Sequence, residues 1–376
     1  MILSENTESA QNRIPSTSTP ICPGEWPGSD TAHLAILGYD PFRYYTGRGP
    51  IESCGAGIEV KPGDIAFRVN FGTVKGKGSV FDKVVVDRRA GRIQDKQVLV
   101  EAVNREVRID GVEFILGNAS GHRAALVFRG ENLSDRITDS DPKKVGEKVK
   151  RVKALDGEAE FIERSHEVLD SHPFNEERAK NGMPKANVLL LRGVGKAVHV
   201  PSFEEKYGMK MAVIAGTTLI KGIGRLLKAD VIENERFTGS RDTDLELKVK
   251  TAVESLETHD FVLLHIKAPD EFGHDGDFEG KKEFIEKIDS AIKPLTELDF
   301  SKVCLVVLAD HTTPVSVKDH TADPVPLTIV CEGVRSDEVE KFSEFHAYRG
   351  GLCRIRGMDL MNIVLDLTGK AKKYGA

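Results

Sequence analysis

The stretches DFVLLHIKAPD (residues 260–270) and SKVCLVVLADH (residues 301–311) are continuous apolar runs that end in charged and imidazole side chains. A run that is apolar at every position predicts a strand buried on both faces, as in the parallel sheets of α/β proteins. Helical patterns separate these runs from similar ones, such as MKMAVIAG (209–216) and PVPLTIVCEG (324–333). The alternation predicts an α/β domain with a doubly wound, mainly parallel sheet covered by helices on both faces.

Shorter alternating runs, separated by Gly and Asp turns, fill the middle of the chain and predict an inserted α+β domain. We place the boundaries so that residues 1–51 and 187–376 form the sheet domain, and residues 52–186 form the insertion. The run ANVLLLRGVG (186–195) is then the strand that reopens the sheet domain.

The composition excludes several classes of protein. A net charge of −6 without a long basic stripe, and only 6% aromatic residues, argue against nucleic acid as a partner. No apolar run approaches the roughly 18 residues of a membrane span, so no membrane partner is expected. Five widely spaced cysteines indicate thiols in a reducing cytoplasm. The sequence does not predict an oligomeric state. The first twenty residues are polar, rich in Ser and Thr, and expected to fray.

Two predicted strand ends carry clusters of possible metal ligands. Asp270 and His274 lie four residues apart, so a helical turn would place them on one side. Asp310 and His311 end another strand, and His320 follows nine residues later. Carboxylates and imidazoles suit Zn, Mn, Co or Mg-like cations. Five such residues at strand ends predict metal binding, and they could hold two ions that clamp a phosphoryl group.

The stretch WPGSDTAHLAILGYDP (residues 26–41) leaves two interpretations of Ser29 open. Ser29 or Asp30 can be the N-cap of the helix that follows, and Ser29 can also be a nucleophile beside backbone N–H groups that favour a phosphate. His33 is expected to be a packing residue of this helix. His265, inside its apolar run, is expected to be a core histidine with satisfied hydrogen bonds.

Six motifs together resemble a known family: PGSDTAHLAILGYDP, YYTGRGP, LIKGIGR, PDEFGHDGD, LADHTTP and KDHTADPVP. They are similar to the archaeal type of cofactor-independent (2,3-bisphosphoglycerate-independent) phosphoglycerate mutase, in the alkaline phosphatase superfamily, and the resemblance runs from residue 23 to the end. It implies an alkaline phosphatase-like domain with an inserted domain. It also implies two divalent metal ions, no 2,3-bisphosphoglycerate, and interconversion of 3-phosphoglycerate and 2-phosphoglycerate through a phosphoserine.

The resemblance also implies roles for single residues. Ser29 matches the nucleophile. One ion would be held by Asp270, His274 and His320, and the other by Asp310 and His311 with the Ser29 oxygen. The metal would be Mn, Co, Zn or Mg.

Cationic residues are expected to bind the anionic substrate, because guanidinium groups pair bidentately with phosphate and carboxylate. The candidates are Arg68, Arg88, Arg89, Arg92 and Arg123 from the insertion. Lys221 of the motif LIKGIGR is a further candidate, as a phosphate contact. Asp87 is a candidate general acid or base, with a plain turn residue as the alternative.

The sequence departs from the family at its start. Family members open with an apolar strand that ends in Asp-Gly, and its Asp completes the second metal site. Here a polar leader without Asp or an apolar run precedes Ser29. We therefore expect the second site to be short of a carboxylate and the sheet to be short of a strand, with neighbouring strands left unpaired. A misassigned start, a truncated chain and a natural variant with altered activity are the competing explanations.

The sequence predicts a cytoplasmic, metal-dependent phosphoglycerate mutase, an isomerase of glycolysis and gluconeogenesis with a small phosphorylated substrate. Two alternatives stay open: another phosphotransferase or phosphomonoesterase of the same superfamily, and a catalytically inactive metal- or metabolite-binding homologue.

Overall fold

The structure, a computed structural model, describes residues 13–19, 26–93, 95–131, 133–134, 136–152, 157–373 and 375. The chain divides into two compact units. Unit 1 comprises Met1–Tyr45 and Ser202–Ala376, and unit 2 comprises Thr46–Pro201. The predicted limits of the insertion, 52–186, therefore differ from those of unit 2 at both ends.

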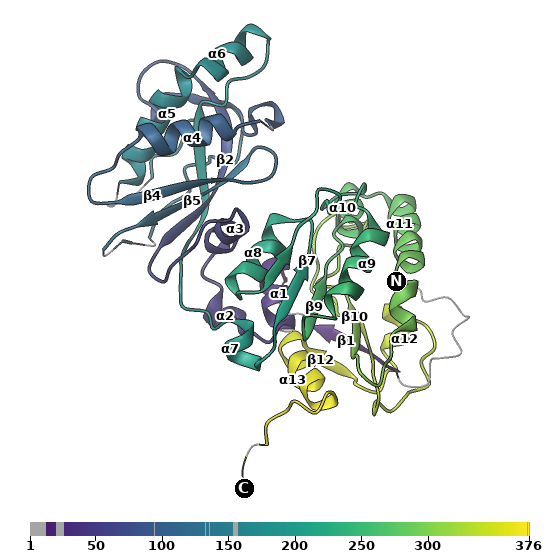
Figure 1. Cartoon of the computed structure of the whole chain (residues 1–376). Coiled ribbons are helices and arrows are strands. Elements are labelled where there is room, and N and C mark those ends of the chain that lie inside the picture. Colours follow the sequence, from purple (N-terminus) through teal and green to yellow (C-terminus); the bar gives the residue numbers. More distant parts are fainter. Residues whose placement is uncertain are drawn as a thin grey trace. The chain divides into compact units, whose positions relative to one another are not determined.

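Unit 1 alternates strands and helices (Figure 1). Its strands are β1 (Arg13–Thr19), β7 (Met211–Ile214), β8 (Asp230–Ile232), β9 (Phe261–Leu264), β10 (Leu305–Leu308), β11 (Val325–Val330) and β12 (Arg354–Arg356). Its helices are α1 (Ser29–Ile36), α2 (Pro41–Tyr44), α7 (Phe203–Tyr207), α8 (Thr218–Leu226), α9 (Leu245–Ser255), α10 (Ala268–Asp275), α11 (Phe278–Ala291), η3 (Lys293–Glu297), α12 (Glu344–Ala347) and α13 (Gly357–Leu367).

The described strands of unit 1 form two sheets, whereas the sequence predicts one. A parallel sheet has the order β8-β7-β9, and a mixed sheet has the order β10-β11-β1-β12. Among the described residues, the outer edges of β9 and β10 pair with no other strand. Both strands line a cavity of about 1130 Å³, together with residues of α1, α11 and α13. The apolar side chains of β9 and β10 are therefore only half-buried, although parallel strands of this composition are usually buried on both faces.

The leader of the chain differs from its prediction. Residues 13–19 form β1, which pairs antiparallel with β11 and parallel with β12. Ile and Thr residues suit an extended backbone, and pairing fixes the segment: residues 13–18 pair with β11, and residues 17–19 also pair with β12. The prediction that the first twenty residues fray is thus wrong for 13–19, and residues 1–12 and 20 lie outside the described residues.

Unit 2 is an antiparallel sheet with helices. Its strands are β2 (Ile65–Lys75), β3 (Val84–Asp87), β4 (Glu113–Asn118), β5 (Arg123–Arg129) and β6 (Val188–Lys196). Its helices are α3 (Arg48–Gly55), η1 (Val80–Asp82), η2 (Ala90–Arg92), α4 (Gln97–Glu106), α5 (Glu158–Asp170) and α6 (Pro173–Lys180).

The central strand of unit 2 is β2, which pairs antiparallel with β3, β5 and β6. The prediction that ANVLLLRGVG reopens the sheet of unit 1 is therefore wrong. This run forms β6. Its Leu191 lies opposite Val69 of β2, and both side chains are completely buried in the core of unit 2. An apolar run of this kind fits any strand buried on both faces, so the pattern alone could not say which sheet it joins.

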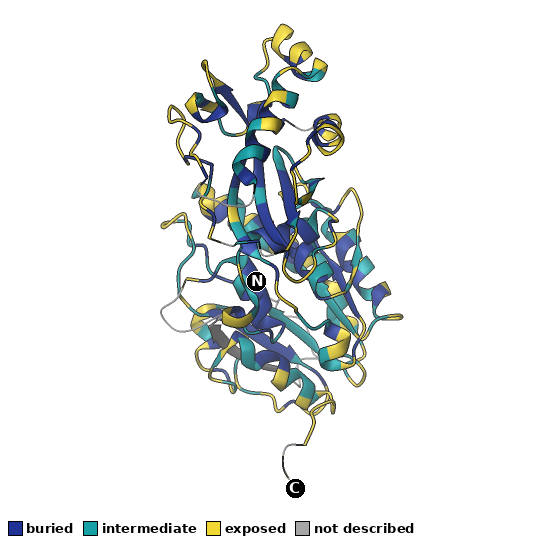
Figure 2. Ribbon diagram, turned by 90° about the vertical axis from the view of Figure 1, so that its left-hand side faces the viewer, coloured by how far each residue is buried: buried dark blue, intermediate teal, exposed yellow. Residues whose placement is uncertain are grey.

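The core of unit 2 lies between its sheet and the helices α4 and α5, where Phe67, Phe128 and Phe161 are buried. The strands of the sheet are drawn largely in the dark blue of buried residues (Figure 2). On the other face α3 packs closely against β2. A methyl group added at Gly49 would lie 2.0 Å from the carbonyl oxygen of Ala66. Gly49 therefore allows the helix to approach the strand backbone.

Two further expectations concern cysteines and membranes. Cys54, Cys304, Cys331 and Cys353 form no disulfide bond, and Cys22 lies outside the described residues. Among the described helices, none combines the length and apolar character that crossing a bilayer requires.

Candidate active site

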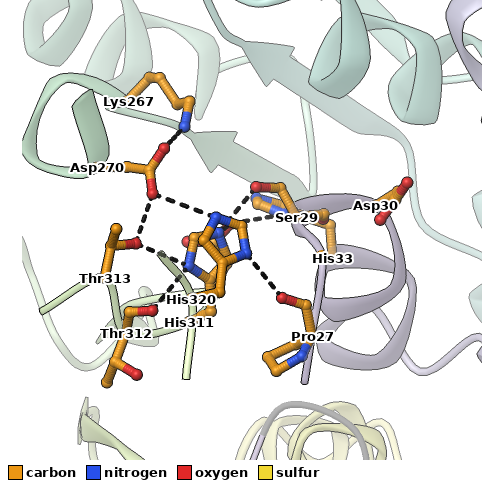
Figure 3. Close-up of polar contacts among 12 residues, drawn as sticks. Pro27, Ser29, Asp30, His33, Lys267, Asp270, His311, Thr312, Thr313 and His320 are labelled. Carbon is orange, nitrogen blue, oxygen red and sulfur yellow. Dashed lines mark hydrogen bonds and ion pairs between the residues drawn. The ribbon is translucent and has the colours of Figure 1, made fainter. Parts of the chain in front are cut away.

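Ser29 is the first residue of α1, and its hydroxyl does not cap the helix. The N-cap position belongs to Gly28, whose N–H donates to Thr31 Oγ1 at 3.2 Å. Asp30 turns its side chain away from the cluster and accepts from the N–H of Thr31 at 3.0 Å (Figure 3). The N-cap interpretation of Ser29 and Asp30 is therefore wrong, because the turn before the helix is closed by Gly28 and Thr31.

The Ser29 hydroxyl contacts a histidine from the end of β10. Its Oγ lies 3.0 Å from Nε2 of His311, whose ring is nearly fully buried. Burial lowers the pKa of His311 to about 4, because desolvation outweighs the attraction of Asp310. The imidazole is therefore neutral near pH 7, and its Nε2 can accept the proton of the serine hydroxyl.

Two carboxylates lie beside this pair: Asp310, whose Oδ2 is 3.4 Å from Nε2 of His311, and Asp270, in the first turn of α10. Oδ1 of Asp270 accepts a hydrogen bond of 2.5 Å from Thr313 Oγ1 and lies 3.5 Å from Nε2 of His320. Its Oδ2 forms an ion pair with Nζ of Lys267. The ring of His320 stacks on that of His311 at 3.7 Å between centroids, so the two imidazoles present their edges side by side (Figure 3).

Three histidines of the cluster share one hydrogen-bonding pattern. Nδ1 faces a backbone carbonyl oxygen in each of them: 2.7 Å to Ser29 for His33, 3.0 Å to Lys318 for His274, and 3.0 Å to Pro27 for His320. An N–H at Nδ1 that donates to a carbonyl leaves the lone pair on Nε2, which is the usual state of a metal-binding histidine. The donor set thus fits divalent cations.

Two groups of possible ligand atoms result, each with its members within 4.8 Å of one another. The first contains Asp270, His311 and His320, and the second contains His33, His265 and Asp310. His274 lies at the rim of the first group, with Nε2 3.4 Å from Asp270 Oδ1 and a side chain that is 40% exposed. The described residues thus bring together all six predicted ligands, but His311 lies with Asp270 and not only with Asp310.

Sequence reasoning missed His33 and His265 as members of the site. His265 was expected to have satisfied hydrogen bonds, and this is wrong: its Nδ1 is buried and has no partner among the described residues. The signal for both was available. His33 follows Ser29 by one helical turn, and His265 is the first residue after β9, at the carboxyl end of a parallel strand.

Unit 2 contains a second polar cluster, around Glu52 of α3. Arg48 Nε lies 2.8 Å and Arg68 Nε 3.5 Å from its carboxylate oxygens. Burial lowers the pKa of Arg68 to about 10, and it also lowers the pKa of Arg123, with neighbouring arginines adding to the effect. Arg192 belongs to the same group. One buried carboxylate thus faces several guanidinium groups, of which Arg48 and Arg192 were not predicted.

The remaining predicted substrate residues have local partners. Arg88 forms two hydrogen bonds with the buried carboxylate of Asp141, at 2.9 and 2.6 Å. Asp87 accepts from the N–H groups of Arg89 and Gly91, both at 2.7 Å, as a turn residue does. In unit 1, Lys221 Nζ donates to Glu233 at 2.6 Å. The side chains of Arg89 and Arg92 are exposed.

A serine hydroxyl beside clustered carboxylates and imidazoles has the composition of a metal-dependent phosphoryl-transfer centre. A model of the family described as 2,3-bisphosphoglycerate-independent phosphoglycerate mutase matches residues 16–175. A 2,3-bisphosphoglycerate-independent phosphoglycerate mutase from Archaeoglobus fulgidus is 62% identical over 366 residues, which cover 95% of this chain and 89% of the relative. One from Methanococcus vannielii is 50% identical over 366 residues, covering 94% and 88%.

Solved structures agree with the sequence comparisons. The structure of a Pyrococcus horikoshii protein is similar with a TM-score of 0.82 and 35% identity, over 98% of this chain and 90% of the other. The cofactor-independent phosphoglycerate mutase of Thermoplasma acidophilum gives a TM-score of 0.71 and 34% identity, over 96% and 90%. The chain therefore belongs to the family of 2,3-bisphosphoglycerate-independent phosphoglycerate mutases, which are isomerases, and its predicted family is confirmed.

Proposed function

We propose that this protein interconverts 3-phosphoglycerate and 2-phosphoglycerate through a phosphoserine at Ser29. The observation that carries the proposal is the contact between Ser29 Oγ and His311 Nε2 at 3.0 Å, inside a cluster of metal-type ligands. In the first half of the reaction, the phosphoryl group leaves O3 of the glycerate for the serine oxygen. In the second half, O2 of the glycerate takes the group back, so no external phosphate donor is needed.

Two divalent ions are proposed for the cluster in unit 1. Asp270, His274 and His320 would hold one, and Asp310, His311 and the Ser29 oxygen would hold the other. Bound there, the ions would lower the pKa of the serine hydroxyl and offset the charge of the phosphoryl group. The ligand types suit Mn, Co or Zn, and the shared orientation of the histidine rings supports the assignment.

Binding of the anionic substrate is proposed for the arginines of unit 2. Arg68 and Arg123 are the strongest candidates, because both are largely withdrawn from water and share one nearby carboxylate, Glu52, with other guanidinium groups. Arg89 and Lys221 are additional candidates. Arg88 and Asp87 are weaker ones, since Asp141 and two backbone N–H groups already occupy their polar atoms.

The finer fold assignment belongs to the same proposal. We infer an alkaline phosphatase-like, doubly wound arrangement. In it, β9 and β10 belong to one sheet and lie on either side of its centre. Support comes from their carboxyl ends, since His265 and Asp310, which follow the two strands, have ligand atoms within 4.8 Å of each other. The enzyme would act in the cytoplasm, in glycolysis and gluconeogenesis.

A coupled assay tests the function. Purified protein, supplied with Mn²⁺ or Co²⁺, should convert 3-phosphoglycerate into 2-phosphoglycerate, detected by the dehydration of the product with added enolase. Ser29→Ala should abolish this conversion, whereas Ser171→Ala, at an exposed serine of unit 2, should leave it unchanged. Release of free phosphate without 2-phosphoglycerate would favour a phosphomonoesterase, and metal binding without turnover would favour an inactive homologue.

A further inference from the structure

One face of the sheet in unit 2 carries a group of polar side chains. Arg68 and Asn70 of β2 point to this face together, because side chains alternate along a strand. Across the ladder, Arg192 of β6 lies opposite Arg68, and Arg123 of β5 lies opposite Asn70. Directly opposite residues share a face, so an uncharged amide lies among three guanidinium groups.

The guanidinium groups on this face can donate further hydrogen bonds. Glu52 of α3 has a buried side chain that lies 2.8 Å from Arg48 Nε and 3.5 Å from Arg68 Nε. Neither contact has the geometry of a hydrogen bond, since both Nε atoms are shielded from solvent and have no hydrogen-bond partner among the described residues. A guanidinium group has donors only, and its planar fork suits carboxylate and phosphate oxygens. The arginines therefore fit the anionic groups of a ligand.

Asn70 offers the complementary group, an acceptor. Its side chain is only 4% exposed, and its Oδ1 has no hydrogen-bond partner in the part of the chain that the structure describes. The backbone is held on both sides, because Asn70 pairs with β5 and with β6. A buried carbonyl oxygen that stays unpaired beside several donors is rare in native proteins. It indicates a hydrogen-bond donor that comes from a ligand.

We propose that Oδ1 of Asn70 accepts a hydrogen bond from the free hydroxyl group of the bound phosphoglycerate. The carboxylate and phosphate of this substrate accept hydrogen bonds, whereas its hydroxyl, on C2 or C3, has a proton to donate. Arginine cannot accept this proton, and ion pairs with Arg48 and Arg68 occupy the carboxylate of Glu52. The amide of Asn70 can turn toward the ligand, since χ2 of asparagine is broad.

The proposal rests on the proposed function and deepens it, because it adds a determinant of specificity. A site that is built to bind a substrate hydroxyl discriminates against an analogue without this hydroxyl, since the acceptor is then left unpaired. Unit 2 should thus prefer phosphorylated hydroxy acids to phosphorylated acids of the same charge. Such a preference separates the contribution of Asn70 from that of the arginines, which respond to charge.

Calorimetric titration of the full chain tests this contact. Ser29→Ala is the parent protein, so that no phosphoryl group is transferred during the titration. The two ligands are 3-phosphoglycerate and 3-phosphonooxypropanoate, which has the same carboxylate and phosphate but a hydrogen atom in place of the C2 hydroxyl. The parent should bind 3-phosphoglycerate more tightly than the analogue by about tenfold or more.

Asn70→Leu in this parent should lower the ratio of the two affinities to about twofold or less, because leucine has a similar volume but no acceptor. Asn70→Asp keeps an acceptor oxygen in the same place. It should retain the preference, although its added negative charge weakens the binding of both anions. Asn181→Leu, at an exposed asparagine of unit 2, is the matched control and should also retain the preference. Urea midpoints show whether each variant is folded.

The outcomes separate this contact from the proposed function. An unchanged ratio in Asn70→Leu, or equal affinities for both ligands in the parent, would overturn the contact even if the mutase assay succeeds with the unchanged protein. Loss of the preference in Asn70→Leu, with its retention in Asn70→Asp, would support the contact even if no mutase activity is found. If Asn70→Leu does not fold, Asn70→Ala, which removes the amide without adding volume, takes its place under the same criteria.

Discussion

Ser29 Oγ and His311 Nε2 lie 3.0 Å apart although 282 residues separate them in the sequence. The contact joins the start of α1 to the end of β10, so the amino end of a helix and the carboxyl end of a strand meet at the same point. Such strand ends are where α/β proteins gather their reactive groups. The pair is therefore the centre from which the chemistry of unit 1 can be tested.

His311→Gln should reduce transfer to and from Ser29 by about 10²-fold or more, because a glutamine amide is a poorer ligand than imidazole for the ion proposed to activate the serine hydroxyl. The value of kcat at saturating Mn²⁺ measures the effect. His199→Gln serves as the control. A kcat that stays within threefold of the unchanged protein would exclude His311 from the reaction.

Lys267→Gln should strengthen metal binding at Asp270 by about tenfold. The ammonium of Lys267 pairs with Asp270 Oδ2, so an incoming cation must displace this charge or bind beside it. Titration of the metal-free protein with Co²⁺ gives the dissociation constant. Lys302→Gln, which breaks an exposed pair with Asp299, should leave the constant unchanged. Weaker binding in Lys267→Gln would contradict this account.

Local sequence patterns predicted many of the strands, because the pattern of apolar residues in a segment reflects how that segment is buried. The apolar runs became β7, β9, β10 and β11. The pattern could not assign β6 to a sheet, since full burial looks the same in either unit. It also gave no indication of β1, because pairing partners far away in the sequence, in β11 and β12, decide its conformation.

The site was predicted to a similar extent. Carboxylate and imidazole residues at strand ends predicted a cluster, and the described residues bring Asp270, His311 and His320 together. His265 escaped notice because a histidine in an apolar run is usually a satisfied core residue, and only the surrounding packing reveals an unpaired nitrogen. The partners of the arginines were likewise not predictable. Arg88 donates to the buried carboxylate of Asp141, and the spacing of the two residues in the sequence does not indicate this contact.

Arg68→Lys should raise the KM for 3-phosphoglycerate by about tenfold or more. The arginine is only 12% exposed, and its Nε has no hydrogen-bond partner among the described residues. A guanidinium fork that is held in place and incompletely paired can bind an anion through two parallel hydrogen bonds, which an ammonium cannot do. Arg105→Lys, at an exposed pair with Glu106, is the control. Equal KM values in both variants would remove Arg68 from the substrate site.

The stability of the metal-free protein should fall as the pH drops from about 6.5 toward 4, and His122 should contribute. Desolvation, and next the charge of Arg123, lower the pKa of this histidine to about 4. In that interval the unfolded chain binds the proton and the folded chain does not, so acid favours unfolding by at most about 1.4 kcal/mol per pH unit. The actual slope is smaller, because solvent reaches part of the ring. In urea unfolding at pH 7 and pH 5, His122→Gln should lose less stability than His199→Gln; equal losses would contradict the assignment.

Gly49→Ala should destabilise unit 2 by about 3 kcal/mol, because the added methyl group cannot be accommodated by rotating a side chain. It would lie 2.0 Å from the carbonyl oxygen and 2.4 Å from the carbonyl carbon of Ala66, so α3 must move away from β2. Gly111→Ala separates this clash from backbone strain: Gly111 has a φ of +74° and nothing within 4 Å of an added methyl group. Gly111→Ala should lower the free energy of unfolding by about 1 kcal/mol, because only the left-handed backbone at this position disfavours alanine. Urea unfolding measures both values, and equal costs would mean that α3 does not depend on this close approach to β2.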